Sequence, residues 1–119
     1  FIAFKKILLK NIMKAKHSKC VSECKKCITA CEKLCESSKG KNEMKDCVKS
    51  CKCCIILCKA MCEMCKCDPD GEMCKKLAKL CAACCKKCCN HCKKNSDHKA
   101  CEVCHTICKK CCNACLKCC

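Results

Sequence analysis

Residues 20–35 read CVSECKKCITACEKLC, and the spacing of the cysteines in this stretch decides the fold. Cys20, Cys24, Cys27, Cys31 and Cys35 are separated by four, three, four and four positions. On an α-helix these side chains fall within an arc of about 80°. The stretch therefore predicts a helix that carries sulfur where a soluble bundle would carry leucine.

Three further segments repeat the pattern. The second sulfur face holds Cys47, Cys51, Cys54, Cys58, Cys62 and Cys65. The third holds Cys74, Cys81, Cys85, Cys88, Cys89 and Cys92, with Cys84 at its margin. The fourth holds Cys101, Cys104, Cys108, Cys111, Cys112, Cys115 and Cys119. Cys53, Cys67 and Cys118 lie off these faces, and whether they bind metal is left open. Four such faces are expected to point at one another, in an all-α four-helix bundle with a thiol-lined interior.

Short breaks separate the four segments, and short links predict antiparallel neighbours. The first break is Ser37–Gly40, with a glycine after the periodic run. In the second, 68–71, Asp68 is predicted to cap the next helix and Pro69 to lie in its first turn. In the third, 95–97, Ser96 or Asp97 is the predicted N-cap. The bundle is thus expected to span residues 17–119.

Residues 1–16 overhang the bundle as a basic amphipathic segment, predicted to be a helical extension. Both phenylalanines and Lys5, Lys6 and Lys10 lie in it. A subunit contact or a flap over the bundle end is the favoured interpretation, with membrane-surface binding as the alternative. No run approaches the roughly 18 apolar residues of a membrane span.

The composition excludes some classes of function and explains the high content of lysine. The chain has 119 residues, 28 cysteines, a formal net charge of +16, and neither Trp nor Tyr. Lysines are spread along the whole chain and no Trp or Tyr is present to stack on bases, so we expect no nucleic-acid partner. Metal ligation deprotonates thiols, and 28 thiolates would reverse the sign of the net charge. The lysines are therefore interpreted as counter-charge for a buried polythiolate.

So many cysteines could serve several chemical roles. Structural disulfides fit poorly, because side chains at i and i+4 of one helix run side by side. A redox centre would need one C-x-x-C at a strand-to-helix turn, and a nucleophile would need a dedicated His. Zinc prefers four ligands in a tetrahedron, whereas soft thiolates select Cu(I) among common metals. A metallothionein-like buffer for Zn(II) or Cd(II) remains the alternative to Cu(I).

Two stretches, KCVSECKKCITAC at 19–31 and HKACEVCHTIC at 98–108, resemble the bacterial copper storage proteins. The most specific element is H-x-x-C-x-x-C-x-x-x-C, matched by His98, Cys101, Cys104 and Cys108. The resemblance implies a four-helix bundle, commonly tetrameric, whose stripe cysteines bind many Cu(I) ions. Adjacent cysteine pairs, such as Cys53-Cys54 and Cys84-Cys85, exceed what the resemblance leads us to expect and predict a high capacity.

The resulting hypothesis is a protein that sequesters and stores Cu(I) and is not an enzyme. Met44 and His98 are expected near one end of the bundle, where they would pass ions inward. Leu77 and Ala78 are expected to plug the other end. A homo-oligomer and a copper-delivery partner of unknown identity are expected. The cytoplasm is the expected compartment, since no signal segment is evident and the thiols must stay reduced.

Overall fold

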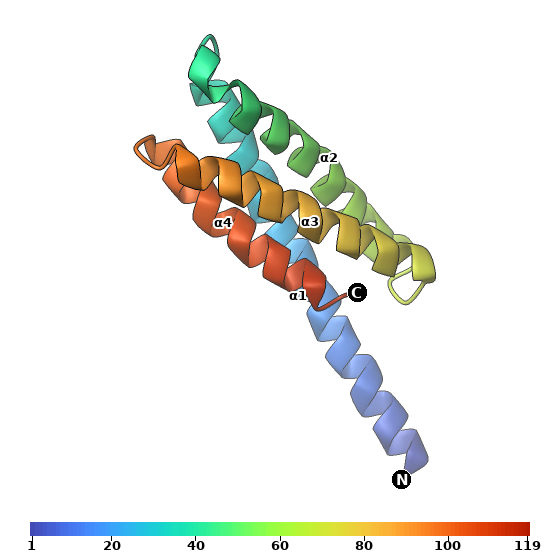
Figure 1. The fold of residues 1–119 in the computed structure, drawn as a ribbon. Helices are drawn as coiled ribbons and strands as arrows, with labels where there is room; N and C mark the ends of the chain where they lie inside the picture. Colours follow the sequence, from blue (N-terminus) through green and yellow to red (C-terminus); the bar gives the residue numbers. More distant parts are fainter.

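A computed structural model describes all residues, 1–119, and it is built from helices alone (Figure 1). The four long helices are α1 (Ile2–Ser37), α2 (Lys45–Cys67), α3 (Glu72–Lys94) and α4 (Lys99–Leu116). A short 3-10 turn, η1 (Asn42–Met44), precedes α2. The predicted all-α class is confirmed.

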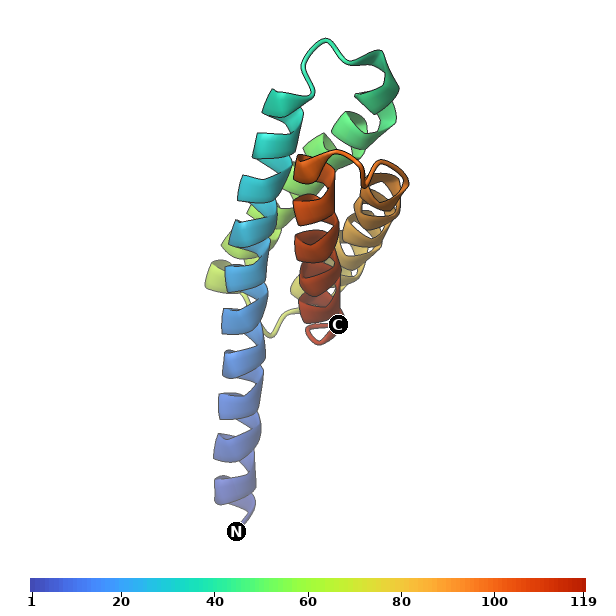
Figure 2. The same ribbon diagram turned by 90° about the vertical axis from the view of Figure 1, so that its left-hand side faces the viewer.

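The helices form an antiparallel bundle in which neighbours in the chain are neighbours in space. α1 packs against α2, α2 against α3 and α3 against α4, and α1 closes the ring against α4. The backbones of the diagonal pairs stay apart, and their cysteine side chains meet in the middle, as Cys51 of α2 and Cys104 of α4 do with their sulfurs 4.0 Å apart. The molecule measures 59 × 21 × 18 Å, and its long dimension comes from α1, which continues well past the other helices (Figure 2).

The bundle interior consists mainly of sulfur. Cysteines occupy most of the buried positions, and the few large apolar side chains that are fully buried are Leu34, Met44 and Met61. A buried thiol behaves as a small hydrophobe, so the four cysteine faces can drive helix packing as leucines would. The predicted antiparallel four-helix bundle is therefore confirmed, with its core where the spacing of the cysteines placed it.

Two of the predicted helix caps are wrong. The Asp68 amide donates to the Met64 carbonyl at 2.9 Å, so Asp68 ends α2, and α3 begins only after Gly71. Pro69 consequently lies in the link and not in a first helical turn. His98, not Ser96 or Asp97, is the N-cap of α4, because the His98 carbonyl accepts the first hydrogen bond of the helix from the Glu102 amide at 3.1 Å.

The first link behaves as its sequence predicts. α1 ends at Ser37, and Gly40 adopts a φ of +77°, a left-handed conformation that glycine reaches without the steric cost of a Cβ. The chain then turns through η1 into α2. The predicted break at Ser37–Gly40 is therefore confirmed.

Residues 2–16 form the first turns of α1 and project beyond the bundle (Figure 2). The large apolar side chains of residues 1–12 are exposed, from Phe1 at 93% to Ile12 at 42%. The predicted helical extension is confirmed, while its status as a separate unit from 17–119 stays a prediction. No helix combines the length and the hydropathy needed to cross a bilayer.

Candidate metal centre

The four sulfur faces meet along the axis of the bundle, and all 28 cysteines are free thiols. Most are fully buried, as the helical spacing predicted. The half-buried ones are Cys35, Cys65, Cys84 and Cys112. Cys53 and Cys67 are exposed, in agreement with their place off the predicted faces.

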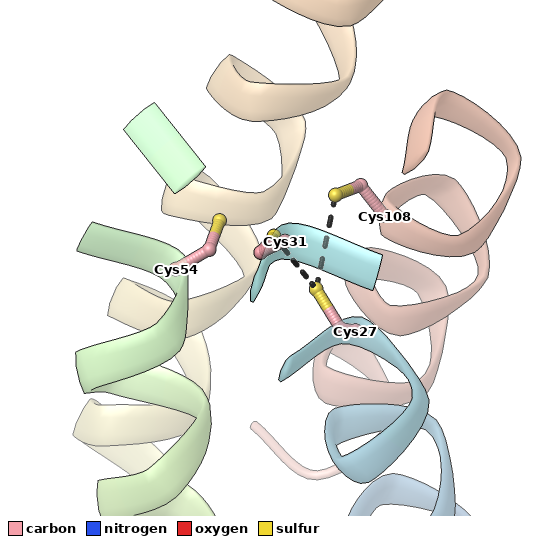
Figure 3. Close-up of side chains that lie close together, drawn as sticks. All are labelled: Cys27, Cys31, Cys54 and Cys108. Carbon is pink, nitrogen blue, oxygen red and sulfur yellow. Dashed lines mark hydrogen bonds between the residues drawn. The ribbon is translucent and has the colours of Figure 1, made fainter. Parts of the chain in front are cut away.

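One group of four sulfurs shows the local geometry (Figure 3). Cys27 and Cys31 come from successive turns of α1, Cys54 from α2 and Cys108 from α4. The Cys27 sulfur lies 3.7 Å from that of Cys108 and 4.0 Å from that of Cys31. Since a metal–thiolate bond is about 2.3 Å, two sulfurs on one ion lie within about 4.6 Å of each other. One ion can therefore be held by sulfurs from three helices.

Further groups follow along the axis, and each shares a member with at least one other group. In each, all the sulfurs lie within 4.8 Å of one another. These groups are Cys31, Cys51, Cys88 and Cys104; Cys27, Cys58, Cys85 and Cys111; Cys24, Cys58 and Cys81; and Cys20, Cys24 and Cys115. Cys24, Cys27, Cys31 and Cys58 each belong to two groups. We call this continuous array the thiol ladder.

Direct sulfur contacts cross two helix seams of the ladder. Between α2 and α3, Cys47 lies 3.5 Å from Cys92, and Cys51 lies 3.5 Å from Cys88. Between α1 and α4, Cys20 lies 3.6 Å from Cys115. Such separations suit bridging by a shared ion, and they are far longer than the roughly 2.05 Å of a disulfide bond.

The C-terminal cysteines are placed differently from the prediction. α4 ends at Leu116, so helical spacing no longer governs residues 117–119. Cys118 turns inward, is only 1% exposed, and donates to the Lys16 carbonyl at 3.6 Å. Cys119, predicted on the fourth face, is exposed, and its sulfur contacts the Cys115 carbonyl. The expectation that Cys119 points inward and Cys118 outward is wrong.

The predicted ligands at the ends occupy two different settings. Met44, the last residue of η1, is 1% exposed and packs into the core, so it closes that end of the bundle. His98 is half-buried at the start of α4. At the opposite end Ala78 is fully buried and Leu77 packs against the core, where they were expected as a plug.

His105 has a partner that the sequence did not identify. Its Nδ1 lies 3.0 Å from the Cys89 sulfur and 3.2 Å from the Cys89 carbonyl oxygen. One thiol of the bundle therefore has an imidazole as its partner. The two residues belong to different helices, and the spacing within one helix holds no information on such a pair.

Burial keeps many of the thiols protonated. It raises the pKa of Cys101 to about 12 and that of Cys62 to about 11. Inside the ladder, hydrogen bonds between thiols raise the pKa of some cysteines and lower that of others. The bond to Cys104 raises the pKa of Cys31 and lowers that of Cys88. Neighbouring thiols thus stabilise one another's thiolates, and an incoming cation has to displace protons.

The reduced, metal-free protein is expected to be helical at pH 7 and to lose stability in alkaline solution. Cys62 and Cys101 have folded-state pKa values above the roughly 8.5 of an exposed thiol, so the fold favours their protonated forms. Their contribution is complete below about pH 8.5 and is lost as the pH rises through 11 and 12. Thermal unfolding followed by circular dichroism from pH 7 to 11 tests this. A constant midpoint, or a coil spectrum at pH 7, would contradict it.

No protein-family model and no curated protein sequence matches the chain. Among solved structures, the fold matches that of a cytosolic copper storage protein from Streptomyces lividans, in a structure of copper loading with five coppers. The TM-score is 0.85, the sequences are 20% identical, and the match covers 91% of this chain and 95% of that chain. The similarity shows that the two chains share the four-helix fold, which is the fold of the family that the sequence resembles.

Proposed function

We propose that this protein sequesters and stores many Cu(I) ions within its thiol ladder. The observation that carries the proposal is the sharing of sulfurs between successive groups, at Cys24, Cys27, Cys31 and Cys58. Shared thiolates bridge neighbouring ions, so the ladder suits a continuous chain of cations better than a few isolated sites. The solved structure with the same fold is described as a copper storage protein.

Cu(I) fits this ladder better than a divalent ion. Soft thiolates select Cu(I), and a monovalent ion is content with two or three sulfurs, which adjoining turns and helices supply. Filling every group with tetrahedral zinc would demand four ligands per ion. Groups of four sulfurs within 4.8 Å are nevertheless present, and they favour the metallothionein-like Zn(II) or Cd(II) buffer as the second candidate.

The proposed storage ligands are the cysteines of the four faces. Cys118 joins them because of its burial, and Cys119 is left out because of its exposure. Met44 and His98 remain predicted transfer residues. Storage is proposed in preference to catalysis, because buried ions held only by thiolate leave no open coordination position for a substrate.

The compartment and the partners of the protein are also part of the proposal. The Streptomyces lividans protein is described as cytosolic, and reduced thiols persist in that compartment, so we propose the cytoplasm for this protein too. A homo-oligomer, tetrameric by the family resemblance, stays a prediction, as does a copper-delivery partner. The exposed apolar side chains of residues 1–12 support a contact with another copy.

Titration of the fully reduced protein with Cu(I), against a chromophoric Cu(I) chelator, tests the proposed function. Because thiolates are shared, saturation is expected at about two-thirds of an ion per cysteine or more, and a parallel zinc titration is expected to end well below half. If zinc bound more tightly than Cu(I), and Cu(I) saturated at no more than one ion per four cysteines, the zinc buffer would replace Cu(I) storage as the proposed function. A free-thiol assay before titration confirms that all 28 cysteines are reduced.

A further inference from the structure

Apolar side chains are buried near both ends of the bundle. Leu34 and Met44 are almost completely buried where the 38–41 and 95–98 links lie. Met61 and Ala78 are fully buried toward the other end. A cation that entered at an end would have to pass these packed side chains. A route from the side, between two helices, would reach the middle of the ladder directly.

A groove of about 640 Å³ lies on the outer surface between α2 and α3. Cys53 and Leu57 line it on α2, and Leu80 and Cys84 line it on α3. His91 stands at one end of the groove, where its Nδ1 contacts the Ser50 hydroxyl. The groove thus presents two thiols and one imidazole, all of them donors that suit Cu(I), to the solvent side of the bundle.

Cys84 connects this groove with the ladder. It is half-buried, and its sulfur lies 3.6 Å from that of the fully buried Cys54. Cys54 in turn belongs to the four-sulfur group with Cys27, Cys31 and Cys108 (Figure 3). A continuous path of sulfur therefore leads from the groove to the middle of the store.

This arrangement explains two of the adjacent cysteine pairs, Cys53-Cys54 and Cys84-Cys85. Neighbours on a helix point about 100° apart, so one member of a pair can face inward while the other faces the groove. Cys54 and Cys85 lie in ladder groups, whereas Cys53 and Cys84 line the groove. Both pairs sit on the same seam, one on each helix.

Three of the other accessible thiols have no such path. Cys35 lines a groove between α1 and α2, but its sulfur donates to the Val48 carbonyl at 3.8 Å and not to a ladder sulfur. Cys67 is exposed at the end of α2 and does not line the groove. Cys119 contacts only a backbone carbonyl.

We infer that the α2–α3 seam is the site where Cu(I) enters and leaves the store, passing from Cys53 to Cys84 and then to Cys54. The inference rests on the proposed function. Each step is a ligand exchange without change of oxidation state. The Cys53 thiol loses its proton as its sulfur bonds to the ion, one carrier ligand leaves, and buffer takes up the proton. Cys84 and then Cys54 repeat the exchange from inside.

The test measures how fast the reduced protein takes Cu(I) from its bathocuproine disulfonate complex, and how fast excess chelator removes it again. Cys53→Ser is compared with Cys67→Ser, which also removes one exposed thiol of α2. Loss of the first transfer ligand is expected to slow uptake and removal alike, by about tenfold, the effect of some 1.4 kcal/mol in the barrier. Final capacity is expected to equal that of the unaltered protein, because Cys53 lies outside the ladder groups. Cys67→Ser is expected to change neither rate nor capacity.

Two further variants separate the outcomes. Cys84→Ala is expected to slow uptake as Cys53→Ser does. Met44→Leu removes the thioether of the predicted route at the bundle end, and uptake that is slowed in Met44→Leu but not in Cys53→Ser would overturn the inference. Equal rates for Cys53→Ser and the unaltered protein would overturn the inference, and so would a lower capacity in Cys53→Ser, which would make Cys53 a storage ligand. Failure of the unaltered protein to take up Cu(I) would instead refute the proposed function. Circular dichroism of each variant checks that it folds.

Discussion

Replacement of Cys27 and Cys31 together by alanine is expected to lower Cu(I) capacity by more ions than the two thiols removed. Each of these sulfurs belongs to two ladder groups, and both belong to the group with Cys54 and Cys108. Their loss therefore affects three successive groups in the middle of the ladder. The central group keeps only Cys54 and Cys108, and its two neighbours lose the sulfurs that bridge them to it. Ions held through those bridges are lost together with the two thiols, so the deficit exceeds simple counting.

The matched control is Cys53→Ala together with Cys67→Ala, which removes two thiols that are exposed and lie in no ladder group. Its capacity is expected to equal that of the unaltered protein. In the variant that lacks Cys27 and Cys31, alanine places no hydroxyl in the core. Each lost thiol is expected to lower the free energy of unfolding by about 1 kcal/mol, because buried contacts are removed. Both variants are compared by chelator competition, with metal-free circular dichroism as the check on folding. Equal losses in the two variants would show that the sulfurs act singly and not as a ladder.

The fold could be predicted because one physical regularity runs through the chain. Spacings of three and four place cysteines on one side of a helix, and a face that excludes water must find a partner. Short links then leave the antiparallel bundle as the simplest arrangement. The same reasoning correctly placed Cys53 and Cys67 outside the core, because helical geometry holds throughout α2.

The prediction failed where helical geometry ends or where two helices must be compared. Cys118 and Cys119 lie beyond the last residue of α4, so a rule of 100° per residue assigned each of them to the wrong side. The caps at Asp68 and Ser96 failed because several polar residues compete in one link, and backbone hydrogen bonds decide among them. The contact of His105 with Cys89 and the step from Cys84 to Cys54 depend on register between helices, which no single segment encodes.

Saturation with Cu(I) is expected to raise the midpoint of thermal unfolding by tens of degrees. The metal-free core contains few large apolar side chains, so its stability lies at the modest end of the range for small domains. Cations that bind the converged sulfurs of the native state far more tightly than the dispersed thiols of the unfolded chain stabilise the fold. One site contributes about 4 kcal/mol when the free ion is at a thousand times its dissociation constant, and further sites add to this. For a domain of this size, each kcal/mol shifts the midpoint by several degrees.

The measurement is helical circular dichroism during heating of metal-free, half-loaded and saturated protein, each fully reduced. Residues 2–12 supply an internal control, because they project from the bundle and contain no cysteine, so their share of the helical signal should not respond to the metal. The bundle transition alone is expected to move with loading. Removal of the metal by a chelator should return it to its original midpoint, which separates bound-ion stabilisation from irreversible oxidation of the thiols. A midpoint that stays constant from metal-free to saturated protein would mean that the ions bind outside the four-helix core, and storage in the ladder would then be untenable.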